Sequence, residues 1–251
     1  MIEHATPTMP AEADRLNGIS YCLWLPENLE HPAPAVIVLH GAGSQKENHA
    51  DFARAAVGQG FVALTFDNRG HGESEGDLGP SVTDDLADLA KFLAGRAEVD
   101  AARIAVRGSS MGGLMAIHAG AASDDVAAVV AICPAAEQSM LPMARSIAAG
   151  EPIPEGSFWG EMRVDAAGLV PWLETNDVYE AAERIGSKPL LLIHAKGDEV
   201  VPYSRSEELY ERAAEPKGLW LLEGGDHRSA QHDAEIQGES LRWLLKNLKS
   251  S

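Results

Sequence analysis

The sequence predicts an α/β fold with a mostly parallel central sheet and helices on both faces. Three observations support this prediction. Apolar runs of strand length alternate with stretches of helical periodicity along most of the chain. The middle runs, such as PAVIVLHG and PLLLIHAKGD, are apolar at consecutive positions, which is typical of strands covered on both sides. The 251 residues, of which 45% are hydrophobic, are enough for one domain with a packed core.

The predicted strands follow one another at regular intervals. They are expected at 20–26, 34–41, 61–67, 103–108, 126–134, 189–198 and 219–227. The first run, SYCLWLP, alternates polar and apolar residues better than the others, and we expect it to be an antiparallel edge strand.

Helices are predicted in the intervals between these strands. Their ranges are 48–60, 81–97, 111–122, 178–186 and 204–214. A last helix is expected near the end of the chain, where Leu241, Leu244, Leu245 and Leu248 share one face. Two serines followed three residues later by an acidic residue predict capped helix starts: Ser81 with Asp84, and Ser204 with Glu207.

One segment, 134–176, contains no strand where the next β-unit should follow. A connection of this length in a compact domain is usually functional or a small subdomain, so we expect a cap over the sheet within a single domain spanning 1–251. A plain surface excursion is the alternative. The apolar side chains expected to line a substrate pocket beneath the cap are Met140, Met143, Phe158, Trp159, Met162 and Trp172. Alternatively, half of them pack the cap onto the sheet.

Composition argues against several classes of partner. The net charge of −18 repels phosphate backbones and anionic lipids, so neither nucleic acid nor membrane is expected as a partner. The two cysteines, Cys22 and Cys133, lie in apolar runs and are expected to be buried, without a disulfide framework or zinc site. The start, MIEHATPTMP, lacks the features of a signal peptide. We expect a cytoplasmic protein that needs no cofactor or metal; the oligomeric state is not readable.

The pattern G-x-S-x-G, typical of a serine nucleophile, occurs twice. In GSSMG the middle residue is Ser110, which follows the strand RIAVRG and precedes the small-residue helix MGGLMAIHAGAA. In GESEG the middle residue is Ser74, which is separated from its strand, followed by a loop and flanked by two glutamates. We therefore expect Ser110 to be the nucleophile and Ser74 to be a turn residue that bonds its own backbone.

A serine nucleophile needs a base, and the base needs an orienting acid. His227 lies in a Gly-rich turn after the last strand, and Asp198 lies in the loop after the strand PLLLIHAKG. Among the other histidines, His40 is expected to pack and hydrogen-bond, His118 to lie too far from the serine, and His194 to be a satisfied core residue.

Two other aspartates, Asp67 and Asp226, also lie close to the ends of predicted strands. The side chain of Asp226 is expected to point away from that of its neighbour His227. Asp67 is expected to form an ion pair with Arg69 in a structural role.

The loop LHGAG follows the strand AVIVL and can turn a backbone N–H toward the active site. We expect Ala42 from this loop, together with Met111 after the nucleophile, to supply the N–H groups of an oxyanion hole. The order serine, acid, histidine is that of the α/β-hydrolases and differs from the chymotrypsin and subtilisin orders.

The chain resembles serine hydrolases of the α/β-hydrolase superfamily over nearly its whole length. The motifs are HGAG at 40–43, DNRGHGES at 67–74, GSSMGG at 108–113, GDEVVP at 197–202 and GGDH at 224–227. The second is similar to a loop that is structural in that superfamily, which again places Ser74 outside the chemistry. Size, spacing and cap are similar to small bacterial cinnamoyl or feruloyl esterases. Those commonly carry G-H-S-x-G-G, and here Ser109 replaces the histidine.

The resemblance implies a carboxylesterase that acts on a small-molecule ester through an acyl-enzyme. Peptidase, amidase or thioesterase activity with the same triad is the alternative, because the sequence does not distinguish the leaving atom. Oligopeptidase-like and dienelactone-hydrolase-like members are also similar, although the latter typically use cysteine where this chain has Ser110. A non-catalytic ligand-binding α/β-hydrolase is the alternative from another class.

Overall fold

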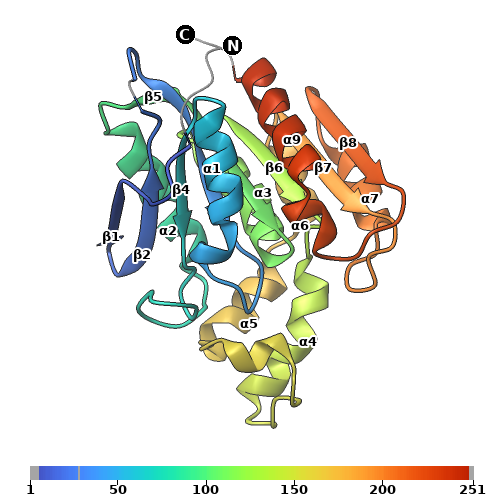
Figure 1. The fold of residues 1–251 in the computed structure, drawn as a ribbon. Helices are drawn as coiled ribbons and strands as arrows, with labels where there is room; N and C mark the ends of the chain where they lie inside the picture. Colours follow the sequence, from blue (N-terminus) through green and yellow to red (C-terminus); the bar gives the residue numbers. More distant parts are fainter. Residues whose placement is uncertain (1–5, 28, 249–251) are drawn as a thin grey trace.

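An eight-stranded sheet forms the centre of the molecule in the computed structural model, which describes residues 6–27 and 29–248. The strand order is β1-β2-β4-β3-β5-β6-β7-β8 (Figure 1). The strands are β1 Glu12–Leu16, β2 Ile19–Trp24, β3 Ala33–Leu39, β4 Val62–Phe66, β5 Val99–Ser109, β6 Ala128–Ile132, β7 Leu190–Ala195 and β8 Lys217–Leu222. From β4 to β8 all neighbours are parallel, which confirms the mostly parallel sheet.

The predicted edge position of the first apolar run is wrong. β2 is antiparallel to β4 as expected, but β1 pairs with its other side and forms the edge. β1 has the sequence EADRL, and its middle residues are exposed. An edge strand of polar residues has no apolar run, so only the tertiary pairing reveals it.

Helices cover both faces of the sheet, as the buried apolar runs predict (Figure 1). On one face α1 (Ala50–Gly58) and α9 (Ala234–Asn247) pack with Phe52 and Leu241 against the strands. On the other face lie α2 (Val82–Ala94), α3 (Met111–Ala122), α6 (Val178–Arg184) and α7 (Ser204–Arg212). Within the described ranges, no helix has the length and apolarity that a bilayer crossing requires.

The segment 134–176 contains α4 (Glu137–Ala148), the 3₁₀ turn η2 (Phe158–Glu161) and α5 (Ala166–Thr175). These elements extend beyond the sheet at the bottom of Figure 1. Leu78 and Val164 form an isolated bridge, and the N–H of Arg163 donates to Gly70 O at 2.9 Å. The segment is therefore joined by backbone hydrogen bonds to the loop that follows β4.

Neither predicted serine makes a capping bond, although Ser81 stands at the predicted position. Ser81 occupies the N-cap position of α2 but has a helical backbone (φ −74°, ψ −4°), and its side chain makes no capping bond. α7 is preceded by Tyr203, so Ser204 is already inside the helix. Effective N-caps have extended backbones that aim the side chain at the next N–H groups. Asp177 and Asp233 do this for α6 and α9.

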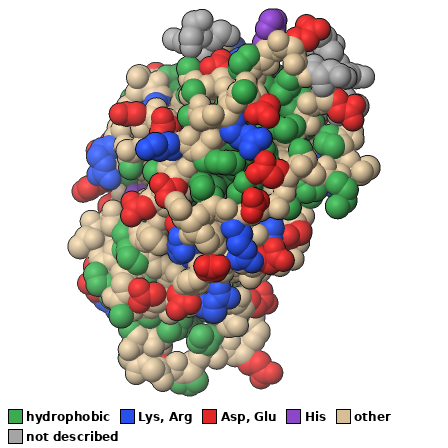
Figure 2. Space-filling model, turned by 90° about the vertical axis from the view of Figure 1, so that its left-hand side faces the viewer, with side chains coloured by type: hydrophobic (Ala, Val, Ile, Leu, Met, Phe, Trp, Pro, Cys, Tyr) green, Lys and Arg blue, Asp and Glu red, His purple; other side chains and the backbone are tan. Residues whose placement is uncertain are grey.

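Charged side chains of both signs share the surface. On the face seen in Figure 2, acidic and basic side chains are interspersed and do not gather in one patch. The expected absence of a signal peptide rests partly on residues 1–5, which lie outside the described residues.

Candidate active site

Ser110 stands at a sharp turn between β5 and α3. Its backbone has φ 55° and ψ −119°, a conformation that non-glycine residues rarely adopt. Strand and helix are so close that a Cβ on Gly108 would lie 2.0 Å from the carbonyl oxygen of Gly112. The small residues of GSSMGG are therefore required by packing, as the sequence suggests, and the turn presents Ser110 at the end of the strand.

Ser74 is a buried structural residue. Its Oγ donates to Asp67 O at 2.6 Å and accepts from the N–H of Ser20 at 2.8 Å. The expectation that Ser74 bonds its own backbone is wrong, because its hydroxyl instead joins the loop after β4 to strand β2. Both hydrogen bonds of its hydroxyl therefore have a structural role.

The expected ion pair of Asp67 with Arg69 is also wrong. Asp67 is fully buried and accepts from both the backbone N–H and the ammonium of Lys46, at 2.7 and 2.8 Å. Arg69 turns to Asp85 on α2, with Nη2 2.8 Å from Oδ1. Residues two apart in a loop diverge, whereas Lys46 lies on the neighbouring loop after β3.

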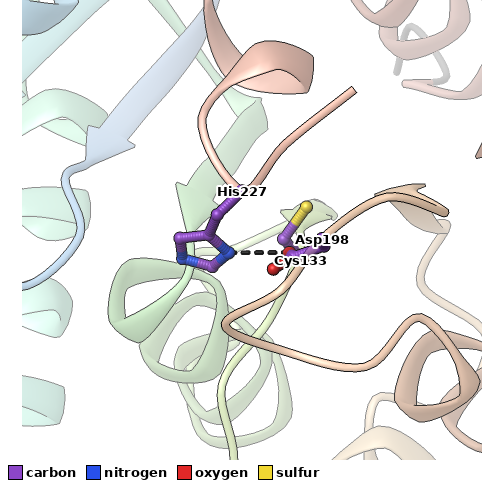
Figure 3. Close-up of side chains that lie close together, drawn as sticks. All are labelled: Cys133, Asp198 and His227. Carbon is purple, nitrogen blue, oxygen red and sulfur yellow. Dashed lines mark hydrogen bonds and ion pairs between the residues drawn. The ribbon is translucent and has the colours of Figure 1, made fainter. Parts of the chain in front are cut away.

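His227 and Asp198 form a hydrogen-bonded pair at the ends of β8 and β7. Nδ1 of His227 lies 2.7 Å from Oδ2 of Asp198 (Figure 3). The N–H groups of Val200 and Val201 donate to Oδ1 of Asp198 at 2.8 and 2.9 Å. Burial alone would raise the pKa of Asp198, but the bonds from His227 and these two N–H groups outweigh it and hold the pKa below its usual value. The carboxylate therefore stays ionised and orients the imidazole.

The other candidate histidines are in supporting positions. His194 is buried, with Nδ1 2.7 Å from Ser206 Oγ and Nε2 3.0 Å from Val201 O, which confirms a satisfied core residue. His40 is buried and accepts from the N–H of Asn68 at 3.0 Å, also as expected. Asp226 does not pair with His227; its Oδ1 instead accepts from the N–H groups of the next turn, at 2.9 Å from Arg228.

The loop after β3 passes directly beside Ser110. A Cβ on Gly41 would lie 3.3 Å from the Cβ of Ser110, and the N–H of Ser44 closes a turn onto Gly41 O at 3.2 Å. Gly43 in this turn has φ 68°, and its N–H donates to Nε2 of His71 at 3.2 Å. Sequence reasoning assigned no role to His71; its place in the GHG loop gave no sign of this contact.

A cleft of 780 Å³ contains Ser110 and His227 together. The HGAG loop, Ala42 included, forms one wall, whereas Met111, the other expected oxyanion donor, is the buried first residue of α3. Further lining residues are Ser44, Asn48, Ser109, Phe158, Glu161, Glu199, Val200, Asp226, Arg228, Gln231 and His232. Glu199 and Val200 were not expected there, because the acid loop that carries them has no apolar periodicity.

Of the apolar residues expected in a substrate pocket, Phe158 alone lines this cleft. Met140, Trp159 and Met162 are buried in the main core, and Met143 packs against it. Trp172 meets His118 edge-on, with 5.1 Å between ring centroids. Most of these large apolar side chains therefore pack the segment against the core, as the alternative interpretation of the sequence predicts.

Cys133, Asp198 and His227 offer one ligand atom each within 4.8 Å of one another, a donor set that metals such as zinc accept (Figure 3). However, Nδ1 and Oδ2 are 2.7 Å apart. Two ligands of a tetrahedral zinc with bonds of about 2.0–2.1 Å are farther apart than this. The geometry therefore fits a hydrogen-bonded pair better. Burial raises the pKa of the Cys133 thiol to about 12, which keeps it protonated; Cys22 is half-buried rather than buried.

Comparisons with known proteins agree with the fold. A family model described as serine aminopeptidase, S33, matches residues 30–153. The uncharacterized protein YqkD of Bacillus subtilis is 30% identical over 242 residues, covering 88% of this chain and 74% of YqkD. Est1E of Butyrivibrio proteoclasticus, solved with ferulic acid, superposes with a TM-score of 0.75 at 24% identity, over 95% of this chain and 99% of Est1E.

A second solved structure, the α/β hydrolase GrgF from Penicillium, superposes with a TM-score of 0.77 at 21% identity, over 92% of this chain and 94% of GrgF. The sheet order, the serine turn between β5 and α3, and these similarities agree. The chain belongs to the α/β-hydrolase superfamily.

Proposed function

We propose that this protein is a serine carboxylesterase in which Ser110, His227 and Asp198 form the catalytic triad. The observation that carries the proposal is the cleft shared by Ser110, on its constrained turn, and His227, whose other ring nitrogen is held by Asp198. Acyl transfer requires a serine presented to solvent and an oriented imidazole in the same cleft.

The reaction has two steps. His227 takes the proton of Ser110 as its oxygen attacks the ester carbonyl, and Asp198 stabilises the resulting imidazolium. The N–H groups of Ala42 and Met111 receive the developing oxyanion, the latter at the start of helix α3. His227 then protonates the leaving alcohol, and water attacks the acyl-enzyme by the same route in reverse.

The cleft favours a neutral, partly aromatic ester. Its volume of 780 Å³ suits a small molecule, and Phe158 and Val200 expose apolar surface to it. Glu161 and Glu199 also line the cleft and disfavour an anionic acyl group. The structural likeness to Est1E with ferulic acid makes a methyl hydroxycinnamate a suitable first substrate.

Replacing each of the two serines by alanine tests the proposal. We expect Ser110→Ala to lower kcat on p-nitrophenyl esters and methyl ferulate by about 10⁴-fold or more, because triad members act as a unit. Ser74→Ala is the matched control and should keep kcat, since Ser74 only joins the loop to β2. A fluorophosphonate probe should label wild type and Ser74→Ala but not Ser110→Ala. Labelling lost in Ser74→Ala and kept in Ser110→Ala would contradict the assignment.

Amide cleavage is the second candidate, favoured by the match to the serine aminopeptidase model. The same triad cleaves esters and amides, and the leaving group decides between them. Rates on matched p-nitrophenyl esters and p-nitroanilides would separate the two. A protein that only binds ligands would turn over neither substrate and would remain unlabelled by the probe.

A further inference from the structure

Arg107 is a fully buried arginine in the middle of the sheet. It lies on β5, three residues before Ser110, and 1% of its surface is exposed. Within residues 6–27 and 29–248 no carboxylate forms an ion pair with it, although the charge of Asp51 on α1 acts on it from a longer distance, and its Nε has no hydrogen-bond partner. A buried charge without a direct ion-pair partner costs stability, and an apolar residue of similar volume is often better tolerated in such a place. The presence of Arg107 at this buried position is therefore better explained by a role other than stabilising the core.

The contacts of Arg107 point to the segment that carries His227. Its guanidinium lies 3.9 Å from the ring centroid of Phe52 on α1. Its Nη2 donates to the carbonyl oxygen of Gln231 at 2.9 Å. Gln231 belongs to the short helix α8 (Ser229–His232), which begins two residues after His227. The hydrogen bond that the guanidinium donates therefore ends on the backbone of this segment.

The chain on the other side of His227 contains two adjacent glycines. Gly224 and Gly225 both have positive φ, at 82° and 80°, and both are exposed. A Cβ on Gly224 would meet no atom within 4 Å. The approach from β8 is open at Gly224 but packed at Gly225, because a Cβ on Gly197 would lie 2.2 Å from the carbonyl oxygen of Gly225. The position of His227 therefore depends on this contact and on the attachment of α8.

The attachment of α8 is shared among three elements. The carbonyl of Gln231 accepts a second bond, from Nε2 of Gln237 on α9 at 3.1 Å. The same Nε2 lies 2.9 Å from Oδ2 of Asp51 on α1, and Nδ1 of His232 lies 3.2 Å from that oxygen. Arg107 contributes the link from β5, the strand that also presents Ser110.

We propose that Arg107 is a positioning residue that holds α8, and through it His227, in register with Ser110. The guanidinium ties the strand of the nucleophile to the segment of the base, while Phe52 holds its plane. The proposal rests on the function proposed above, because the positioning affects kcat only if His227 serves as the base. A displacement of about 1 Å between reacting groups can cost about 10²-fold in rate.

Arg107→Met separates this role from a structural one. Methionine keeps a long, apolar side chain but removes the guanidinium, and with it the contact with Phe52 and the bond to Gln231. We expect kcat on p-nitrophenyl acetate to fall by about 10- to 100-fold with KM nearly unchanged, and the melting temperature to be maintained. Arg107→Lys should recover part of the rate, since an ammonium can still donate. Arg103→Met is the matched control on the same strand; Arg103 pairs with Asp100 and should leave kcat unchanged.

A readout without turnover makes the test independent of the assigned activity. The proton on Nδ1 of His227, shared with Asp198, should give a far-downfield proton resonance in wild type and Arg103→Met, and a broadened or lost one in Arg107→Met. Wild-type kcat and an unchanged resonance in folded Arg107→Met would overturn the proposal. If Arg107→Met does not fold, Gln237→Met, which removes the other donor to Gln231, decides by the same two measurements. An unlabelled wild type with the resonance lost in Arg107→Met would reject the esterase function and keep the positioning role.

Discussion

Phe158 and Trp159 are neighbours on η2 with different environments. Phe158 is 43% exposed and lines the cleft, whereas Trp159 is 4% exposed and belongs to the core. The sequence places both in one apolar stretch and predicts the same role for each. Which of two adjacent aromatic residues faces substrate depends on the direction in which η2 meets the HGAG loop, so the sequence pattern alone does not separate them.

We expect Phe158→Ala to raise KM for aromatic esters several-fold with little loss of stability, because it removes exposed apolar surface from the cleft. Trp159→Ala should lower the free energy of unfolding by about 3–5 kcal/mol, as large-to-small core substitutions do. Steady-state kinetics with methyl ferulate and urea titrations of both variants measure the two effects. Equal KM changes in both variants would show that η2 acts as a unit.

At the scale of elements, a buried pair joins helix α3, which follows Ser110, to the segment 134–176. His118 on α3 has Nε2 2.5 Å from Oε1 of Glu137, the first residue of α4. The other oxygen of Glu137 accepts from the N–H of Val178 at the start of α6, at 3.0 Å. One carboxylate thus fixes three helices. The sequence predicts helix α3 and places His118 away from Ser110, but the partner lies 19 residues along the chain, in a segment for which the sequence predicts no strand.

We expect Glu137→Ala to lower the free energy of unfolding by about 3–5 kcal/mol, because it leaves buried His118 and the N–H of Val178 without their partner. Glu174→Ala is the control: it breaks the exposed pair with Arg145 and should cost less than about 1 kcal/mol. Urea unfolding at pH 7 measures both. A cost for Glu137→Ala as small as that of the control would show that α4 is not held by this pair.

At the scale of the whole molecule, buried histidines limit stability in acid. Burial lowers the pKa of His40 to about 4 and, with help from Arg107, that of His49 to about 3. Both are neutral in the folded protein, while in the unfolded chain they bind a proton below pH about 6.5. The contribution of these two neutral histidines to the free energy of unfolding is therefore complete above this pH. It is lost as the pH falls toward their pKa values in the folded protein.

We expect the free energy of unfolding to fall below pH 6.5 by about 1.4 kcal/mol per pH unit for each of these histidines, since the unfolded state binds the extra proton. Carboxylates with lowered pKa, such as Asp51, add to the loss only below about pH 4. Urea titrations between pH 7 and 5 measure the slope. His49→Gln should reduce it, and the exposed His31→Gln should not; equal slopes in all three proteins would contradict the explanation.

The sequence by itself determined the parallel sheet, the serine turn and the three residues proposed as the triad. These depend on local signals: consecutive apolar residues, small residues around Ser110, and polar residues directly after strands such as Asp198. These signals can be recognised in the sequence because the carboxyl ends of parallel strands meet at one edge of the sheet, so residues that follow different strands come together there.

Only the tertiary structure decided the polar edge strand, the wall of the cleft and the partners of buried charges. β1 carries no apolar pattern, Asp67 is paired with Lys46 on another loop, and Arg107 meets Gln231 across 124 positions of sequence. The physical reason is the same in each case. A buried polar group must be paired with a group that is close in space. That partner can lie far away along the chain, so the pairing produces no recognisable pattern in the sequence.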